Sequence, residues 1–107
     1  MDITASQYGS ISVFTLRGRA DSVGASQLEQ ALRDAGNFRV ILDMSQLAYI
    51  NSAGLRILAE SLTVNRDNGG DLRLVAPSMR IQRVFQIIGF DHFFRVFDTL
   101  DAALKDF

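Results

Sequence analysis

The sequence predicts an α/β fold: a single domain in which a mixed β-sheet is packed by about four helices. Short apolar runs rich in β-branched residues alternate along the 107-residue chain with longer segments whose apolar residues recur every three or four positions. Turn residues separate these segments at short spacing, which leaves no room for a second domain. A chain of this length can bury one hydrophobic core without crosslinks, so we assign residues 1–107 to one domain.

The first third reads as a hairpin followed by a helix. Residues 3–7 are expected to form a short edge strand, residues 8–10 a turn, and residues 11–16 a second strand with alternating apolar positions. Residues 18–21 should end that strand. Asp21 and Ser22 are both good helix caps, so a helix is expected from there to about Ala35, with Leu28, Leu32 and Ala35 facing the core.

The middle third carries a buried strand and a second helix. Residues 38–43 contain a continuous apolar run at residues 40–42 and suit the centre of a sheet covered by helices, and we expect this strand to end near Asp43. A short connection then reaches Tyr49, and the helix begins at Asn51 or Ser52. Its inner face should hold one set of apolar residues at helical spacing: Leu55, Leu58, Ala59 and Leu62. Residues 68–70, Asn-Gly-Gly, end it.

The last third repeats the alternation. Residues 72–76 predict a strand, and Pro77 and Ser78 open a helix that Gly89 ends. The inner face of that helix is expected to contain Ile81, Val84, Phe85 and Ile88. Residues 94–97 predict a last strand, and Asp98 or Thr99 caps a terminal helix. The resulting order, β-β-α-β-α-β-α-β-α, contains crossovers that should be right-handed.

Composition limits the class of function. With 11 basic and 12 acidic side chains the formal net charge is −1, which argues against direct nucleic-acid binding. Lys105 is the only lysine, so no Walker-type phosphate loop is present. The absence of cysteine fits a reducing compartment, the N-terminus does not resemble a signal peptide, and no apolar run approaches membrane-spanning length. We therefore expect a cytoplasmic protein without a membrane span.

No set of residues predicts catalysis. His92 is the only histidine and lies among aromatic residues, where an imidazole is usually structural. Neither a cysteine nor a second histidine is available as a metal ligand, and Ser52 lacks the Gly-x-Ser-x-Gly elbow of a nucleophilic serine. We expect no enzyme activity, no metal and no cofactor.

Ser52 is the residue that the sequence singles out. It lies at the expected entrance of the second helix, where unpaired backbone N–H groups and the helix dipole favour an acceptor oxygen or an anion. One interpretation is that Asn51 or Ser52 simply caps the helix. The other is that Ser52 is a regulated hydroxyl, because a phosphate there would be tolerated by the helix end and would repel a partner. Local chemistry alone favours the cap.

The stretch from Asp43 to Leu55 resembles the signature of the STAS family, the bacterial anti-sigma-factor antagonists. In that family a strand is followed by an aromatic residue, an apolar residue and Asp-Ser-Ser/Thr-Gly-Leu, and the serine directly after the Asp is phosphorylated. Here the corresponding sequence is Tyr-Ile-Asn-Ser-Ala-Gly-Leu at residues 49–55, so the serine is Ser52, the Asp is replaced by Asn51 and the second hydroxyl by Ala53. Residues 18–21 match the family's Gly-x-Leu-Asp turn, whose acidic residue, here Asp21, lies near the serine. As a residue type, Asp21 is otherwise an ordinary helix cap.

The resemblance implies a partner-switching module. Unphosphorylated, the domain would bind an anti-sigma factor that is also a serine protein kinase; phosphorylation of Ser52 would release it, and a PP2C-type phosphatase would reset the switch. The residues expected to bind the partner are Asp21, Asn51, Ser52, Ala53, Gly54, Leu55 and Arg56. The alternative is a STAS scaffold subunit, never phosphorylated, of a larger signalling or lipid/anion transport assembly. The sequence leaves open whether the domain forms a homodimer.

Overall fold

The computed structural model describes all residues, 1–107, and shows the predicted order of elements. Each predicted strand and helix is present, with one additional short 3-10 turn before the last strand. The elements are β1 (Asp2–Tyr8), β2 (Ile11–Ala20), α1 (Ser22–Asp34), β3 (Arg39–Ile50), α2 (Ser52–Asp67), β4 (Asp71–Val75), α3 (Met79–Ile88), η1 (Phe90–His92), β5 (Val96–Phe97) and α4 (Leu100–Leu104).

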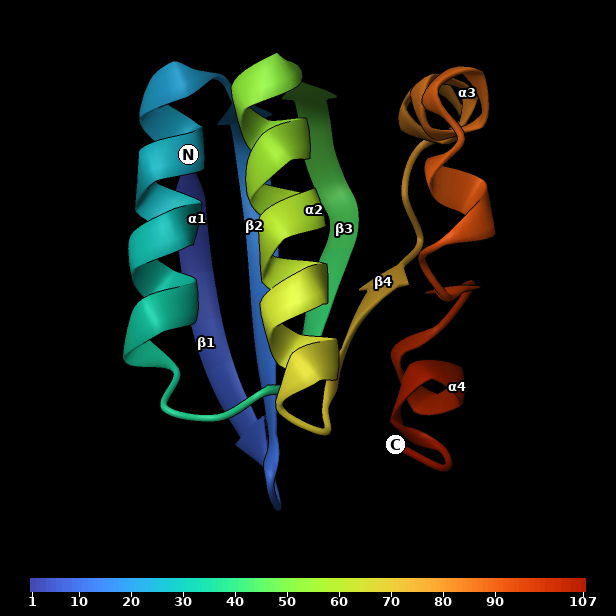
Figure 1. Cartoon of the computed structure of the whole chain (residues 1–107). Coiled ribbons are helices and arrows are strands. Elements are labelled where there is room, and N and C mark those ends of the chain that lie inside the picture. The colour runs from blue at the N-terminus through green and yellow to red at the C-terminus, as the bar shows by residue number, and fades with distance from the viewer.

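The five strands form one mixed sheet in the order β1-β2-β3-β4-β5. β1 is antiparallel to β2, and every later neighbour is parallel. Figure 1 shows α1 and α2 side by side across the face formed by β1, β2 and β3, with α3 and α4 at the β4 side. The predicted fold class, a mixed sheet packed by helices, is confirmed.

Alternation along the strands divides the core into two clusters. Phe14, Leu42 and Leu74 are register partners in β2, β3 and β4, and they belong to the larger cluster with α1, α2 and α3. Val13 and Ile41, each one residue earlier, belong to the smaller cluster that packs with Ala103 of α4. Successive side chains of a strand point to opposite faces, so one apolar run supplies both layers.

A buried arginine holds the C-terminal segment against the sheet. Arg73 of β4 is only 3% exposed and donates hydrogen bonds to the carbonyl oxygens of Ala103 (2.8 Å), Lys105 (2.8 Å) and Asp106 (3.1 Å). Its guanidinium also lies 4.2 Å from the centre of the Phe107 ring. Burial lowers the pKa of Arg73 from its ordinary value. Carbonyl groups at the end of a helix lack partners within the helix, so the Arg73 side chain caps the C-terminus of α4.

The predicted end of the third strand near Asp43 is wrong. β3 continues to Ile50, and its second half pairs with the second half of β2, from Arg17 to Ala20. Residues 18–21 were expected to end that strand, but 18–20 belong to it. The β2–β3 ladder has two register shifts: one between Asp43 and Gln46 accommodates the exposed polar residue Ser45, and the other lies at the exposed Ala48. Side-chain hydrogen bonds from Ser45 to Asp43 (2.7 Å) imitate a turn locally, although the backbone stays extended.

Several predicted core positions are also corrected. In α2, Leu55 and Ala59 are only partly buried, whereas Ile57 is 2% exposed, because the helix meets the sheet along the stripe that starts at Gly54. Leu32 and Ala35 of the first helical segment are likewise partly buried. Two further differences lie near the C-terminus: Ile88 is 44% exposed at the end of α3, and β5 is only two residues long. None of the helices has both the length and the apolar character that crossing a bilayer requires.

Candidate functional site

At the entrance of α2, one residue caps the helix and the next carries the free hydroxyl. Asn51 has extended backbone angles (φ −104°, ψ −175°), and its side-chain oxygen accepts a hydrogen bond from the Gly54 N–H at 3.1 Å. Asn51 is therefore the N-cap, and Ser52 is the first residue of the helix. Ser52 is exposed and its hydroxyl makes no hydrogen bond within the domain. The hydroxyl that the sequence singled out is thus accessible and is not the cap.

Gly54 lets the first turn of α2 approach the end of the sheet. A Cβ built on this residue would lie 2.7 Å from Cγ1 of Ile50 and 3.1 Å from the carbonyl oxygen of Ala20. Both distances are shorter than ordinary contacts, so the glycine is required by packing inside the domain. Gly54 itself is buried and cannot offer a side chain to a partner.

The remaining predicted site residues of α2 divide into packed and free side chains. Ala53 and Leu55 are partly buried and pack against the larger core cluster. Arg56 is exposed and pairs with Glu60 one turn later, with 3.1 Å between Nη1 and Oε1. Ser52 and Arg56 are therefore the polar side chains that this entrance presents to solvent.

Asp21 occupies the same structural position in the preceding strand-helix unit. Its carboxylate caps α1 by accepting a hydrogen bond from the Gly24 N–H at 2.9 Å. That backbone hydrogen bond is the main reason that the pKa of Asp21 lies below its ordinary value, with smaller contributions from the positive charges of the N-terminus and Arg19. The two entrances are adjacent, because Ala20 and Ile50 are register partners and the Asn51 N–H donates to the Ala20 carbonyl at 3.0 Å.

The two entrances share a sequence pattern whose significance we did not predict. Residues 21–24 read Asp-Ser-Val-Gly and residues 51–54 read Asn-Ser-Ala-Gly. In each, the first residue caps the helix, the serine is the exposed first helical residue, and the glycine donates its N–H to the cap. Sequence reasoning missed Ser22 and Gly24 as counterparts of Ser52 and Gly54, although the repeat of a capping residue followed by Ser-x-Gly was the signal that would have found them.

An aromatic-cationic contact borders the site. The guanidinium of Arg19 lies 4.1 Å from the centre of the Tyr49 ring, and these two residues are register partners in β2 and β3. Nearby, Arg17 donates to the side-chain oxygen of Gln46 at 2.6 Å. The extended halves of β2 and β3 are therefore joined by side chains as well as by backbone, and they hold both helix entrances at one edge of the molecule.

These features define a small mixed-sheet α/β domain in which two capped helix entrances meet at the carboxyl ends of adjacent parallel strands. The family model of the STAS domain matches residues 2–103. The chain belongs to the STAS domain family, as the residues 43–55 indicated.

Relatives with this architecture share a described class of function. BtrV of Bordetella bronchiseptica, named "Putative anti-sigma factor antagonist BtrV", is 34% identical over all of this chain and 95% of its own length. The anti-sigma-F factor antagonist RsfB of Mycobacterium tuberculosis is 29% identical over 95% of this chain and 85% of its own. A solved anti-sigma factor antagonist from Mycobacterium paratuberculosis superimposes with a TM-score of 0.85, at 28% identity, over 96% of this chain and 90% of that one.

Proposed function

We propose that this domain is an anti-sigma-factor antagonist that works by partner switching in the cytoplasm. Unphosphorylated, the α2 entrance binds an anti-sigma factor that is also a serine protein kinase; phosphorylation of Ser52 releases it, and a PP2C-type phosphatase restores the binding form. The observation that carries the proposal is the exposed Ser52 hydroxyl at a helix entrance where Asn51 performs the capping. Relatives named as anti-sigma factor antagonists support the class of partner.

The switch rests on where a phosphate would be placed. A phosphoserine adds about two negative charges, which the N-terminus of α2 tolerates because its backbone N–H groups and dipole favour an anion. The domain therefore stays folded after modification. A partner that has desolvated the same surface and supplies no cation of its own meets a dianion there, and a penalty of about 3 kcal/mol reduces affinity about 100-fold.

Arg56 would respond to the modification. It lies one helical turn after Ser52, at the (i, i+4) spacing at which an acidic group stabilises a following base. In the unmodified domain it pairs with Glu60. A phosphate on Ser52 competes with Glu60 for this guanidinium. Phosphorylation would therefore add negative charge at Ser52 and change the orientation of the Arg56 side chain.

Asp21 and Asn51 are the supporting residues of the proposed interface. Asp21 contributes the only capping carboxylate of the paired entrances, one strand away from Ser52. Asn51 supplies an amide where the family has a carboxylate beside the serine. In this proposal Asp21 helps to position the partner or its metal-bound nucleotide, and Asn51 sets which kinase accepts the chain.

Phosphorylation by the cognate kinase tests the proposal directly. The purified domain is incubated with the kinase and ATP, and the phosphate is located by mass spectrometry. We expect modification of the wild type and of Ser22→Ala, and none of Ser52→Ala. Ser22 is the matched control because it is also an exposed serine at the first position of a helix. Phosphate on Ser22, or continued modification of Ser52→Ala, would contradict the assignment of Ser52.

Asn51 also favours a second function, a constitutive STAS scaffold in a signalling or transport assembly. Without a carboxylate next to the serine, a partner that requires it would bind the domain and never modify it. A pull-down with wild type, Ser52→Ala and Ser52→Asp separates the two functions, with Ser22→Asp as the control. Loss of the partner from Ser52→Asp alone supports switching, whereas equal recovery by all four proteins supports the scaffold.

A further inference from the structure

The two edges of the sheet are protected very differently. β5 forms one edge with only two residues, a length that offers little to another strand. β1 forms the other edge with seven residues, Asp2–Tyr8, all exposed except the partly buried Ile3. The outer side of β1 therefore presents a row of backbone N–H and C=O groups that no element of the domain covers.

β1 also lacks the devices with which proteins usually block an edge. It contains no lysine, arginine or proline, and its one charged residue, Asp2, lies at its end. Its register with β2 runs without interruption from Asp2–Arg17 to Tyr8–Ile11, whereas the β2–β3 ladder has two irregularities. A long, regular and nearly uncharged edge strand favours pairing with a further strand.

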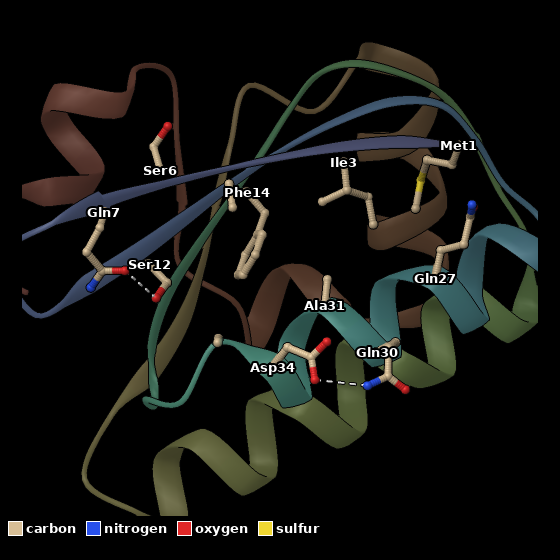
Figure 2. A pocket seen from close by; sticks show the side chains of 12 residues that line it. Met1, Ile3, Ser6, Gln7, Ser12, Phe14, Gln27, Gln30, Ala31 and Asp34 are labelled. Atoms are coloured by element: carbon tan, nitrogen blue, oxygen red, sulfur yellow. Dashed lines mark hydrogen bonds between the residues drawn. The ribbon is translucent and has the colours of Figure 1, made fainter.

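A groove beside β1 gives such a strand access. It has a volume of about 800 Å³ and lies between β1, Phe14 of β2 and the second half of α1 (Figure 2). Ile3 and Ala31 contribute apolar surface from its two sides. This space separates α1 from β1, so side chains of an added strand would have room between the helix layer and the sheet edge.

Four of the six polar side chains that line the groove are hydrogen-bonded, namely Gln7, Ser12, Gln30 and Asp34, whereas Ser6 and Gln27 are not. Gln7 accepts a hydrogen bond from Ser12 at 3.0 Å and donates to the Gly9 carbonyl at 3.0 Å, and Gln30 donates to Asp34 at 2.9 Å (Figure 2). Most of the polar lining is therefore not free to bind the polar groups of a small ligand. The outward backbone N–H and C=O groups of β1 also have no partner within the domain, and the backbone of another strand would pair with them.

We propose that β1 pairs antiparallel with β1 of a second copy of this chain and joins the two sheets into one. A two-fold axis through Ala5 places equivalent strands antiparallel. All seven residues then pair: Ala5 faces Ala5 of the second copy, Thr4 faces Ser6, Ile3 faces Gln7 and Asp2 faces Tyr8. No like charges oppose each other, hydroxyls meet across the axis, and the phenol of Tyr8 is a donor for the Asp2 carboxylate.

The backbone of Ala5 is suited to the centre of this interface. Tyr8 and Ile11 flank the two-residue turn whose first residue, Gly9, has φ +62°, as expected for a type II′ hairpin closed by a hydrogen bond between the flanking residues. Alternate pairs of an antiparallel ladder turn their backbone groups outward. Counted from Tyr8, Ala5 is one of the outward residues, so both of its backbone groups are available to the second copy.

Analytical ultracentrifugation from about 1 µM to about 1 mM tests the proposal. Wild type should form a dimer as concentration rises. Ala5→Lys places two ammonium groups opposite each other across the axis and should weaken dimerisation about tenfold or more. An equimolar mixture of Ala5→Lys and Ala5→Glu should restore it, because each pair is then of opposite charge. Thr63→Lys, at an exposed position of α2, is the matched control and should dimerise like wild type.

Each contrary result overturns the proposal. A wild type that stays monomeric throughout the range, an unchanged dimer with Ala5→Lys, or a charge-swapped mixture that remains monomeric would do so. Hydrogen exchange on wild type alone provides a second measurement: β1 amides should become more protected as concentration rises, and β5 amides should not. The interface does not involve Ser52, since β2 separates β1 from β3. Phosphorylation of Ser52 in Ala5→Lys should therefore be normal, and either proposal can fail alone.

Discussion

The two helix entrances are built alike and differ in charge. Both place an extended capping residue at the end of a parallel strand, an exposed serine at the first helical position and a glycine two residues later. At α1 the cap is the carboxylate of Asp21, whose pKa is lowered mainly by its hydrogen bond with Gly24. At α2 the cap is the neutral amide of Asn51. The dipole of α1 thus already faces a negative charge, whereas the entrance of α2 can gain one, and this contrast is why we propose Ser52 and not Ser22 as the phosphorylated residue.

The largest expected difference concerns the glycines. A Cβ at Gly24 would lie 2.4 Å from the backbone carbonyl oxygen of Arg19, which cannot move aside, whereas a Cβ at Gly54 would lie 2.7 Å from a side-chain atom, Cγ1 of Ile50, and 3.1 Å from the nearest backbone atom, the carbonyl oxygen of Ala20. We expect Gly24→Ala to lower the free energy of unfolding by about 3 kcal/mol and Gly54→Ala by about 1 kcal/mol. Urea denaturation measures both. Equal losses, or a larger loss for Gly54→Ala, would show that the two entrances are not packed as described.

The second difference concerns partner affinity. Ser52→Asp adds a carboxylate at the first position of α2, where the helix dipole stabilises it, so the variant should fold normally. We expect it to weaken binding of the anti-sigma factor at least about tenfold, or about 1.4 kcal/mol, in isothermal titration calorimetry. Ser22→Asp makes the same chemical change at the equivalent position of α1 and should change affinity less than about twofold. Equal weakening by both variants would place the docking surface over both entrances.

The third difference concerns the cap of α2. Asn51→Ala removes the acceptor for the Gly54 N–H and should lower the free energy of unfolding by about 1 kcal/mol. Asn51→Asp keeps an acceptor, adds the charge that α1 already has, and should raise stability by about 0.5 kcal/mol at neutral pH. Chemical denaturation in low salt checks both values. A destabilised Asn51→Asp would indicate that the amide group of Asn51, and not only its oxygen, is needed.

Some structural features of the domain were predictable from the sequence and others were not. The order of elements and the stop at Gly89 were predicted correctly, and the caps Asp21 and Thr99 were each one of two predicted candidates, because caps and turn residues act locally. The second half of β3 was not, because Ser45 and Gln46 resemble turn residues and only the pairing with β2 keeps them extended. Periodicity placed Leu55 in the core and missed Ile57, since the approach of α2 at Gly54 sets which stripe is buried.

Part of the site was likewise predictable. The motif placed Ser52 at the helix entrance, and the structure shows that its hydroxyl is exposed. The motif could not show which of Asn51 and Ser52 is the N-cap, because both residue types cap helices. Only the backbone angles and the hydrogen bond from Gly54 identify Asn51 as the cap. The family resemblance implied that Asp21 lies near Ser52, but the residue pattern alone did not, because that proximity depends on the register of Ala20 with Ile50.

The smallest expected difference between the two entrances is in how the stability contributed by each cap depends on pH, and it appears only at acidic pH. Because the folded pKa of Asp21 is lowered, its charged cap contributes stability that is fully present above the ordinary aspartate pKa of about 3.9 and is lost as pH falls through the folded value. Asp21→Asn keeps an acceptor and should therefore lose less stability than wild type between about pH 5 and about pH 2 in thermal melts. Asn51→Ala, which removes a neutral cap, should lower the melting temperature by the same amount at every pH in that range. Parallel pH curves for wild type and Asp21→Asn would mean that the Asp21 carboxylate is not selectively stabilised by α1, and the contrast in charge between the two entrances would then have no energetic consequence.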